Sequence, residues 1–355
     1  MRRGAIVITS VAMAIAVEPA GAQATRQAAA PDSGRAYLWM DGSYQSIGLP
    51  SVANFGVQGL LPPALVVPGG SEKHDPRLGG YGVGGGIGYT FAHGVFSPLW
   101  GADVRVELGG SYVRADGTSL SQSAPVTNVN LTALSIAGEV VGVAGCGGTI
   151  CFSQSVLSSD YAAWNIHLKG KSDFRSGQWI VTPSIALIAG RGETSQHLVQ
   201  QTFANGAPYP LLGYGMNAAL NWTDVGAKIG LDTRYDFLNG FSAGLIGSIG
   251  VAHRSAAMSA DTSILFSSLV PKLSAIQDSQ NSAPVLANLE ARLTARLMPN
   301  MTAKGFAGVN YDSSTPGIVA PQGSLLSPTG TPARIKFDST TSYYAGAGLN
   351  ISFGQ

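Results

Sequence analysis

The chain has few charged residues and, beyond its N-terminal region, no long apolar run. Of its 355 residues only 12% are Asp, Glu, Lys or Arg, about half the share usual for globular proteins. The 21 basic and 20 acidic residues nearly cancel, and no basic block suggests nucleic-acid binding. A membrane-spanning helix needs roughly 20 consecutive apolar residues. The mature sequence has no such run, which excludes a plain helical membrane protein.

The N-terminus has the features of an export signal. Arg2 and Arg3 give a basic start, and residues 5–17 form an apolar core too short for a spanning helix. Ala22-Gln23-Ala24 fits the small-x-small cleavage pattern. We therefore predict a signal peptide over residues 1–24 and a polar periplasmic leader over residues 25–33.

Cysteine is scarce too. The two cysteines, Cys146 and Cys151, stand in C-G-G-T-I-C. Their four-residue gap does not fit a CxxC redox pair, and two cysteines alone cannot make a usual zinc site. Because an exported chain passes through an oxidising compartment, we predict a small loop disulfide. No two histidines have ligand spacing, so we expect neither a metal nor a cofactor.

What the sequence does contain is long alternation of apolar and polar residues. From Val285 to Leu297 every odd position is apolar, and Asn288, Glu290, Arg292 and other polar residues stand between them. Side chains on a strand alternate faces, so one face is apolar and the other is charged. Alternation of this length, repeated behind a signal peptide, is typical of a transmembrane β-barrel with lipid outside and water inside.

Residues 34–353 contain ten such segments, joined by alternately long and short connections. We predict an all-β, antiparallel, up-and-down transmembrane barrel of about ten strands, with 8 or 12 as alternatives. Long loops of such barrels are extracellular and short turns periplasmic, which places both termini in the periplasm. The predicted long loops span residues 46–78, 115–157, 193–218, 259–282 and 313–335.

Aromatic residues lie in bands at the ends of these segments, as expected for membrane girdles. The band at the short-turn end consists of Phe91, Trp100, Trp179, Phe237, Phe241 and Phe353. The band near the long loops consists of Tyr112, Tyr311 and Tyr343.

The stretch W-T-D-V-G-A-K-I-G-L-D-T-R-Y-D-F-L-N-G-F-S, residues 222–242, resembles the Legionella major outer membrane protein family. The matching positions are Trp222, Gly226, Gly230, Asp232, Tyr235, Gly240, Phe241 and Ser242. Members are described as pore-forming outer-membrane barrels, so the resemblance implies a pore. It transfers no catalytic residue.

Two catalytic-looking motifs fall in the wrong context. The G-x-S-x-G of Gly240 to Gly244 follows a hairpin turn and enters a strand, whereas a nucleophile elbow needs a strand-turn-helix. The G-x-G-x-x-G of Gly80 to Gly85 has no following helix. Its glycines instead clear lumen space or admit a neighbouring side chain.

The inner faces of the predicted strands have charges of both signs. The predicted pore-lining residues are Asp103, Arg105, Glu107, His167, Lys169, Lys228, Asp232, Arg234, Glu290, Arg292, Arg296 and Lys304. They form either a charged constriction in a water-filled pore or a network of ion pairs that plugs a narrow barrel. Eight-stranded barrels are filled by side chains and barrels of about 16–18 strands contain a wide channel. A ten-stranded barrel is closer to the first kind, so any pore is narrow.

The favoured function is therefore a narrow, porin-like outer-membrane channel for small polar solutes, and not an enzyme. The alternatives are an outer-membrane protease or lipid hydrolase, or a non-conducting surface anchor or adhesin. An enzyme needs an assembled acid/His or Ser/His set at the outer rim; the candidates His74, His197, Asp75, Asp116 and Glu193 are scattered. Expected partners are outer-membrane lipid and the barrel-assembly machinery, with no nucleic acid. The sequence leaves the oligomeric state open.

Overall fold

The computed structural model describes most of the chain after residue 33. The described residues are 34–53, 57–61, 65–67, 72–91, 103–123, 125, 127, 130–145, 148–238, 240–266, 269–324 and 327–353. The predicted signal peptide and leader lie outside them. Within the described ranges no helix is both long and apolar enough to cross a membrane.

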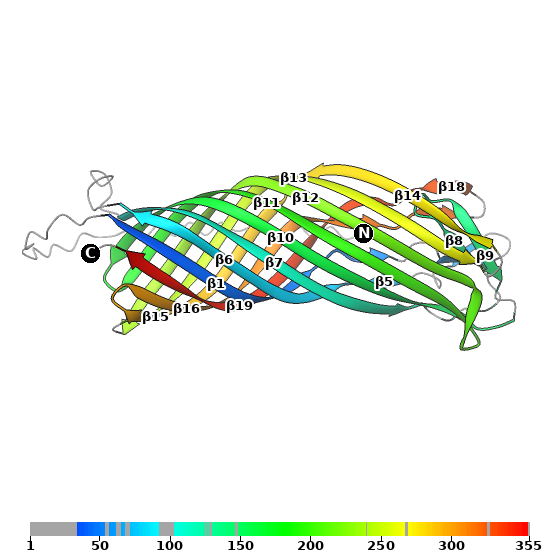
Figure 1. Cartoon of the computed structure of the whole chain (residues 1–355), viewed down its shortest axis with the longest axis horizontal. Coiled ribbons are helices and arrows are strands. Elements are labelled where there is room, and N and C mark those ends of the chain that lie inside the picture. Colours follow the sequence, from blue (N-terminus) through cyan, green and yellow to red (C-terminus); the bar gives the residue numbers. More distant parts are fainter. Residues whose placement is uncertain are drawn as a thin grey trace, which may run out of the picture. The chain divides into compact units, whose positions relative to one another are not determined.

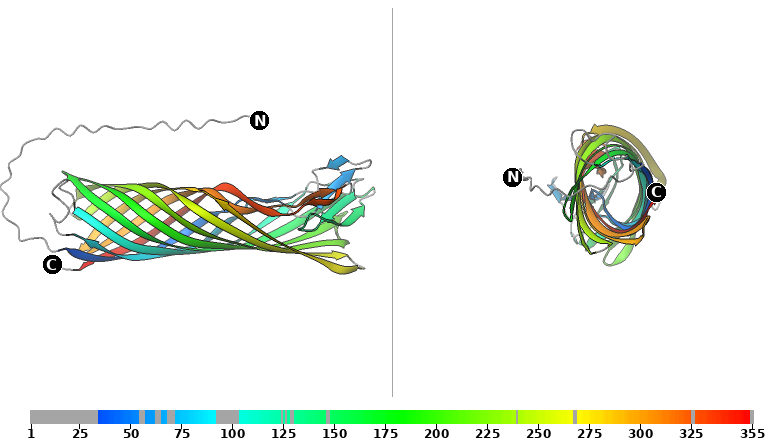
Figure 2. Two further views of the ribbon diagram at one scale, coloured as in Figure 1. Left: turned by 90° about the horizontal axis from the view of Figure 1, so that it is seen from above. Right: turned by 90° about the vertical axis from the view of Figure 1, so that its left-hand side faces the viewer.

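Ten antiparallel strands form a closed ring, which confirms the predicted fold (Figures 1 and 2). In chain order they are β1 (Arg35–Gly48), β6 (Arg77–Thr90), β7 (Asp103–Gln122), β10 (Cys151–Ser176), β11 (Trp179–Ala204), β12 (Ala207–Leu238), β13 (Phe241–Phe266), β15 (Val285–Met298), β16 (Met301–Val319) and β19 (Arg334–Phe353). Each pairs with the next, and β1 pairs with β19 from Ala36↔Phe353 to Ser46↔Tyr343 to close the ring. The order is that of an up-and-down barrel.

The two ends of the barrel differ. At the near end lie the start of β1, the end of β19 and the short connections β10–β11, β12–β13 and β15–β16. The end of β6 and the start of β7 also lie at the near end. At the far end lie the connections β1–β6, β7–β10, β11–β12, β13–β15 and β16–β19, together with the smaller elements. These are β2 (Val52–Ala53), β3 (Val57–Leu61), β4 (Leu65–Val67), β5 (Lys73–His74), β8 (Asn130–Leu134), β9 (Val140–Gly145), β17 (Gln322–Ser324) and β18 (Ser327–Thr331). β14 (Leu269–Ser282) extends the wall beside β13, above the point where Pro284 separates it from β15.

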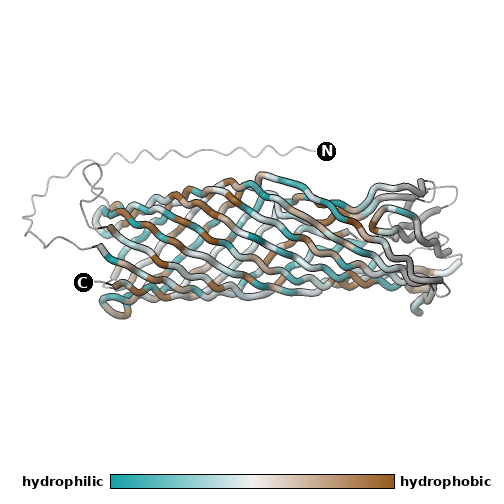
Figure 3. Tube along the Cα trace, turned by 45° about the horizontal axis from the view of Figure 1, so that its top comes forward, coloured by the Kyte–Doolittle hydropathy of each residue, from teal (hydrophilic) through white to brown (hydrophobic). Residues whose placement is uncertain are grey.

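A continuous belt of apolar side chains covers the outside of the barrel only in its near half; farther along, exposed apolar residues such as Leu120, Val156 and Val199 stand among polar ones. On β11 the outward row is apolar from Trp179 to Ala189 and turns polar at Arg191. That length is close to the roughly 9–11 residues that a tilted strand needs to cross a bilayer. Figure 3 shows apolar and polar residues alternating along the strands. The predicted girdle residues Trp179, Phe237, Phe241 and Phe353 are all exposed, as they must be to meet lipid.

Beyond this belt the apolar residues move from the outer face of the barrel wall to its inner face, although the strands continue without a break. On β12, Val225 and Ile229 point outward in the belt, whereas Met216 and Leu220 point inward farther along and are buried. On β13, Met258 is buried inside while its neighbour Ser259 is exposed. The far half is therefore a water-exposed barrel whose interior combines apolar side chains with buried polar ones such as Gln196 and Gln200.

This exchange corrects the predicted loop boundaries. Residues 193–218 are not a loop: β11 and β12 continue to a two-residue turn at Asn205 and Gly206, both with positive φ (50° and 80°). Much of 259–282 lies in β13 and β14, and parts of 46–78, 115–157 and 313–335 extend the barrel strands. The prediction ended each strand where apolar residues ceased to alternate outward, but the backbone pairing continues.

An apolar core closes the inside of the far half. It combines inward residues of the wall with residues from the far-end connections: Val52, Ile136, Cys151, Leu157, Leu198, Tyr214, Met216, Ala218, Leu220, Trp222, Ala256, Met258, Ala260, Ile318, Ala333 and Ile335. Ile136 is fully buried; its N–H donates to Thr262 Oγ1, and its carbonyl accepts from Ala333 N. We call this group the far-end core.

The inner glycines of β6 make room for the side chains of β1. A Cβ at Gly86 or Gly88 would overlap Trp39 or Tyr37, respectively. The G-x-G-x-x-G of Gly80 to Gly85 thus lies in a strand. Its glycines do what the sequence suggested and admit neighbouring side chains.

We predict that Gly88→Ala destabilises the barrel, because the added methyl would displace the Tyr37 ring. Overpacking of this kind costs about 1–3 kcal/mol. Gly305→Ala is the matched control, since a Cβ there meets nothing within 4 Å. Urea titration of both variants in micelles measures the difference; equal midpoints would contradict the packing described.

Side-chain orientation can be tested on β15. Leu289 is exposed on the outside, and Thr294 is on the lumen side. Arg in place of Leu289 should cost about 2–4 kcal/mol, because the guanidinium would enter lipid. Thr294→Arg should cost much less. Equal losses of unfolding free energy in lipid vesicles would refute the assignment of faces.

Candidate functional site

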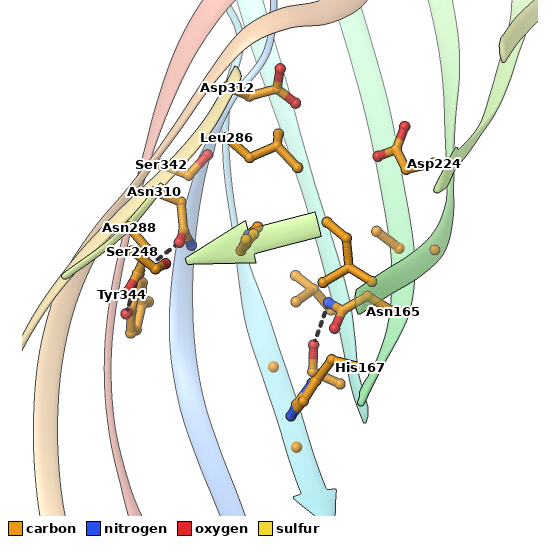
Figure 4. A pocket seen from close by; sticks show the side chains of 18 of the residues that line it. Asn165, His167, Asp224, Ser248, Leu286, Asn288, Asn310, Asp312, Ser342 and Tyr344 are labelled. Atoms are coloured by element: carbon orange, nitrogen blue, oxygen red, sulfur yellow. Dashed lines mark hydrogen bonds between the residues drawn. The ribbon is translucent and has the colours of Figure 1, made fainter. Parts of the chain in front are cut away.

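A cavity of about 560 Å³ lies inside the barrel, and its lining combines polar and apolar side chains. Figure 4 shows Asn165 and His167 of β10 on one side and Asn288, Asn310 and Tyr344 of β15, β16 and β19 on the other. Most of the lining comes from inward positions of the barrel strands. This cavity is the candidate site, and charged and hydrogen-bonded groups lie at its two ends.

One network at the near end centres on Glu107 of β7. Its carboxylate accepts from Lys171 Nζ at 2.7 Å and from Tyr37 Oη at 3.2 Å, and His167 Nε2 lies 3.3 Å away. Glu107 is 6% exposed. A buried carboxylate needs such partners, since an unpaired charge there would be strongly destabilising.

A second near-end group surrounds Trp39 of β1. Lys304 Nζ is 2.8 Å from Asp41 and lies over the Trp39 ring at 5.4 Å. On its other side Trp39 stacks with His167, with ring centroids 6.2 Å apart. The indole therefore joins the Glu107 network to the Asp41–Lys304 pair and narrows the lumen between them.

A third group lies on β15. Arg292 donates to Glu290 at 2.8 Å, and its Nη1 is 3.9 Å from Asp232. Tyr344 donates to Glu290 at 3.0 Å and accepts from Asn288 at 2.7 Å. These bonds fix the polar wall opposite Asn165.

Arg254 of β13 lies at the top of the cavity and is 3% exposed. It donates two parallel bonds of 2.7 Å to Asp224, and its Nη1 is 2.8 Å from Asp312 and 2.7 Å from Ser314 O. Its guanidinium also lies 6.0 Å from the Trp222 ring. The triad of Arg254, Asp224 and Asp312 separates the polar cavity from the far-end core.

A separate cluster, which we call the far-end latch, attaches the segment before β6 to the inner wall. It consists of Glu72, His74, Ser119, Ser155 and Gln200. Ser155 donates to Glu72, and Gln200 donates to Glu72 at 3.3 Å. His74 lies 2.8 Å from Ser155 Oγ and 3.2 Å from Ser119 Oγ. Glu72 is 3% exposed and His74 fully buried.

The latch lies beyond the apolar belt, and burial dominates its titration. Burial raises the pKa of Glu72 from 4.5 to about 7, and the hydrogen bonds from Ser153 and Gln200 offset this only in part. Burial also lowers the pKa of His74, against smaller opposing effects of Ser119 and the Asp75 carboxylate. Asp75 itself pairs with Lys73 on the exposed side, at 3.1 Å. Below about pH 7 the latch is therefore a neutral hydrogen-bonded cluster.

The structure brings most of the predicted pore-lining residues into these groups. Glu107 and His167 share one network, Asp232, Glu290 and Arg292 share another, and Lys304 pairs with Asp41. Arg105 pairs with Asp173, and Arg234 with Asp236 at 3.3 Å. Lys169 and Lys228 line the cavity. Arg296 is exposed near the turn at Gly240, and Asp103 begins β7.

Sequence reasoning missed several groups as site residues. They are Tyr37, Trp39, Asp41, Lys171, Asp173, Asp224, Arg254, Asp312 and Tyr344, together with the latch residues. The alternation of side chains between the two faces of a strand already marks Asp41 and Asp224 as inward. Arg254 has the same signal, because it follows the outward-facing His253 on β13, but it was not predicted as a site residue. The contacts of Glu72 cross more than eighty residues of sequence, beyond the reach of any local pattern.

The other sequence candidates do not assemble into catalytic chemistry. Ser242 is buried inside strand β13. His197 lies on the outer face, where its Nδ1 is 2.6 Å from Asn217 Oδ1, and among the described residues no serine hydroxyl bonds to it. Within the same ranges, no three His, Cys, Asp or Glu side chains could hold a metal. Cys151 is buried and disulfide-bonded; its predicted partner Cys146 lies outside the described residues.

Comparison with known proteins gives a likeness of architecture only. No family model and no curated protein matches the sequence. Among solved structures, the outer membrane protease OmpT from Escherichia coli is 10% identical over 91% of this chain and 97% of its own, with a TM-score of 0.41. A Pseudomonas aeruginosa FadL homologue is 10% identical over 91% and 90%, with a TM-score of 0.24. The CymD monoaromatic hydrocarbon channel is 9% identical over 89% of each chain, with a TM-score of 0.24.

The latch should weaken as the pH rises. Because Glu72 has a raised pKa, the stability from its protonated form is complete below pH 4.5 and is lost as the pH passes about 7. The loss is on the order of 3 kcal/mol. His74 acts in the opposite sense, since its protonation below pH 6.5 opposes burial. Glu72→Gln should remove the loss at high pH.

Hydrogen exchange of residues 72–80, corrected for intrinsic rates, measures this effect. The wild type should lose protection progressively between about pH 4.5 and pH 7, whereas Glu72→Gln should show no such loss with rising pH. Lys73→Gln on the exposed side of the same segment is the control and should follow the wild type. An identical decline in Glu72→Gln would contradict the assignment.

Proposed function

We propose that the protein is a narrow outer-membrane channel for small polar solutes, with its near end in the periplasm and its far end outside the cell. The apolar belt, the aromatic girdles and the resemblance of residues 222–242 to pore-forming barrels support this placement. The observation that carries the proposal is the direction of the ion pairs inside the barrel.

The lumen charges pair along the wall and not across it. Glu107 and Arg105 of β7 bond to residues of the adjacent β10, and Arg254 of β13 bonds to the adjacent β12. Pairs such as Asp41–Lys304 skip a single strand. In a ring of ten strands, opposite walls are five strands apart. A network that plugs the lumen would need bonds across that distance, whereas bonds along the wall leave the central space open.

The cavity supports the same function. Among its lining residues are asparagines, serines and charged groups that can hydrogen-bond to a hydrated solute, interspersed with apolar side chains such as Ile188 and Leu286. The far-end core and the latch close it on the outer side in this conformation. Conduction therefore requires the segment around Glu72 and His74 to leave the inner wall, and hydrogen bonds alone hold its polar groups there.

Single-channel recording in planar bilayers tests the proposal. The wild type should open rarely and with small conductance. Glu72→Ala together with His74→Ala should raise the open probability without changing the conductance of the open state, because the latch lies outside the constriction. Lys73→Ala is the control. Silence of both the wild type and the latch variant would favour a non-conducting anchor.

A further inference from the structure

Two lysines stand apart from every ion pair in the cavity. Lys169 of β10 and Lys228 of β12 both line it. Within the described residues neither forms an ion pair or hydrogen bond, whereas the acidic residues of the lining already have cationic partners. Those acidic residues are Asp41, Asp224, Glu290 and Asp312.

The barrel register places the two lysines at one level. Lys169 is directly opposite Ala186 of β11, and Ala186 is directly opposite Lys228. Their backbones are therefore two strands apart, about 10 Å. The side chain between them is only a methyl group, and lysine stems are long and flexible. The Lys228 stem packs over Gly250 on the β13 side in this structure, and both ammonium groups can approach one ligand over Ala186 when that stem turns toward β11.

Small residues hollow the wall around Lys228. A Cβ on Gly250 of β13 would overlap the Lys228 stem, and a Cβ on Gly230 would approach Ser184 Oγ to 2.8 Å. Ser184 and Ser248 also line the cavity, and their hydroxyls have no hydrogen-bond partner among the described residues. We call the space around Lys169, Ala186 and Lys228 the recess. Its wall thus carries hydroxyl groups as well as the two ammonium groups.

Apolar side chains border the same recess. Ile188 follows Ala186 on the inner face of β11, and Leu286 is directly opposite Gly250. Close by, the triad of Arg254, Asp224 and Asp312 has one more carboxylate than cations. This excess negative charge disfavours a dianion but leaves room for a single charge between the lysines.

We propose that this recess binds a small monocarboxylate with a short apolar tail. The carboxylate has two oxygens that accept from both ammonium groups and from the serine hydroxyls. The tail would contact Ile188 and Leu286. Binding would also relieve the repulsion between two unpaired like charges. This deepens the proposed channel function by naming a solute class, and it rests on that function only for the solute's route into the cavity.

Calorimetric titration of the full-length protein in micelles with sodium butyrate tests the site. Butyramide, which has the same tail and no charge, should not bind detectably. Lys169→Met and Lys228→Met should each weaken butyrate binding about ten-fold or more, and the double variant should abolish it. Lys336→Met is the control, because Lys336 pairs with Asp338 at the far end, and it should retain the wild-type affinity.

Equal binding of butyrate and butyramide to the wild type would overturn the proposal without any variant, so it stays testable even if a lysine variant does not fold. Unchanged butyrate affinity in a folded double variant would overturn it as well. The two proposals also fail separately. Butyrate binding by a protein that never conducts would leave this site standing and remove the channel, and conduction without butyrate binding would do the reverse.

Discussion

The rest of this structure depends on the pairing of backbone polar groups in lipid. Hydrocarbon offers no partner to an N–H or a C=O, so a sheet that crosses it must close on itself. Here the closure is the long antiparallel pairing of β1 with β19. Once the ring is closed, every strand must place alternate side chains outside and inside. The lumen, its charges and its cavity all follow from that alternation.

The second constraint is that the strands are longer than the membrane is thick. β12 has 32 residues and β10 has 26, far more than the roughly 9–11 that a bilayer requires. The extra length lies in water, where the stable arrangement is polar outside and apolar inside. Between Trp222 and Val225 the apolar positions of β12 move from one parity to the other. One strand thus serves as a membrane wall in its near half and as the wall of a water-exposed core in its far half.

These constraints explain what the sequence could and could not predict. The ring of strands, the belt and the inward charges of the near half follow from one rule, apolar residues outward, which holds wherever lipid is present. The same rule failed beyond Arg191, where the barrel is surrounded by water. It therefore predicted a loop over residues 193–218, where the structure has paired strands. The ion-pair networks could not be predicted from the alternation of faces alone. Which inward lysine pairs with Asp41 depends on barrel tilt and ring closure, and Lys304 reaches it from two strands away.

The distribution of charge also limits how a solute could move. Ion pairs between neighbouring strands stabilise the wall and largely cancel each other's fields, so they contribute polarity to the lumen with little net attraction. Lys169 and Lys228 are the departure from this pattern among the cavity residues described. The two lysines lie between the near-end networks and the Arg254 triad and would be the most favourable position for an anion in the lumen. The nearly neutral groups on either side would bind the anion less strongly. A site that is favourable to enter, yet bordered by groups that bind the solute only weakly, is the arrangement that allows selective passage and not permanent capture.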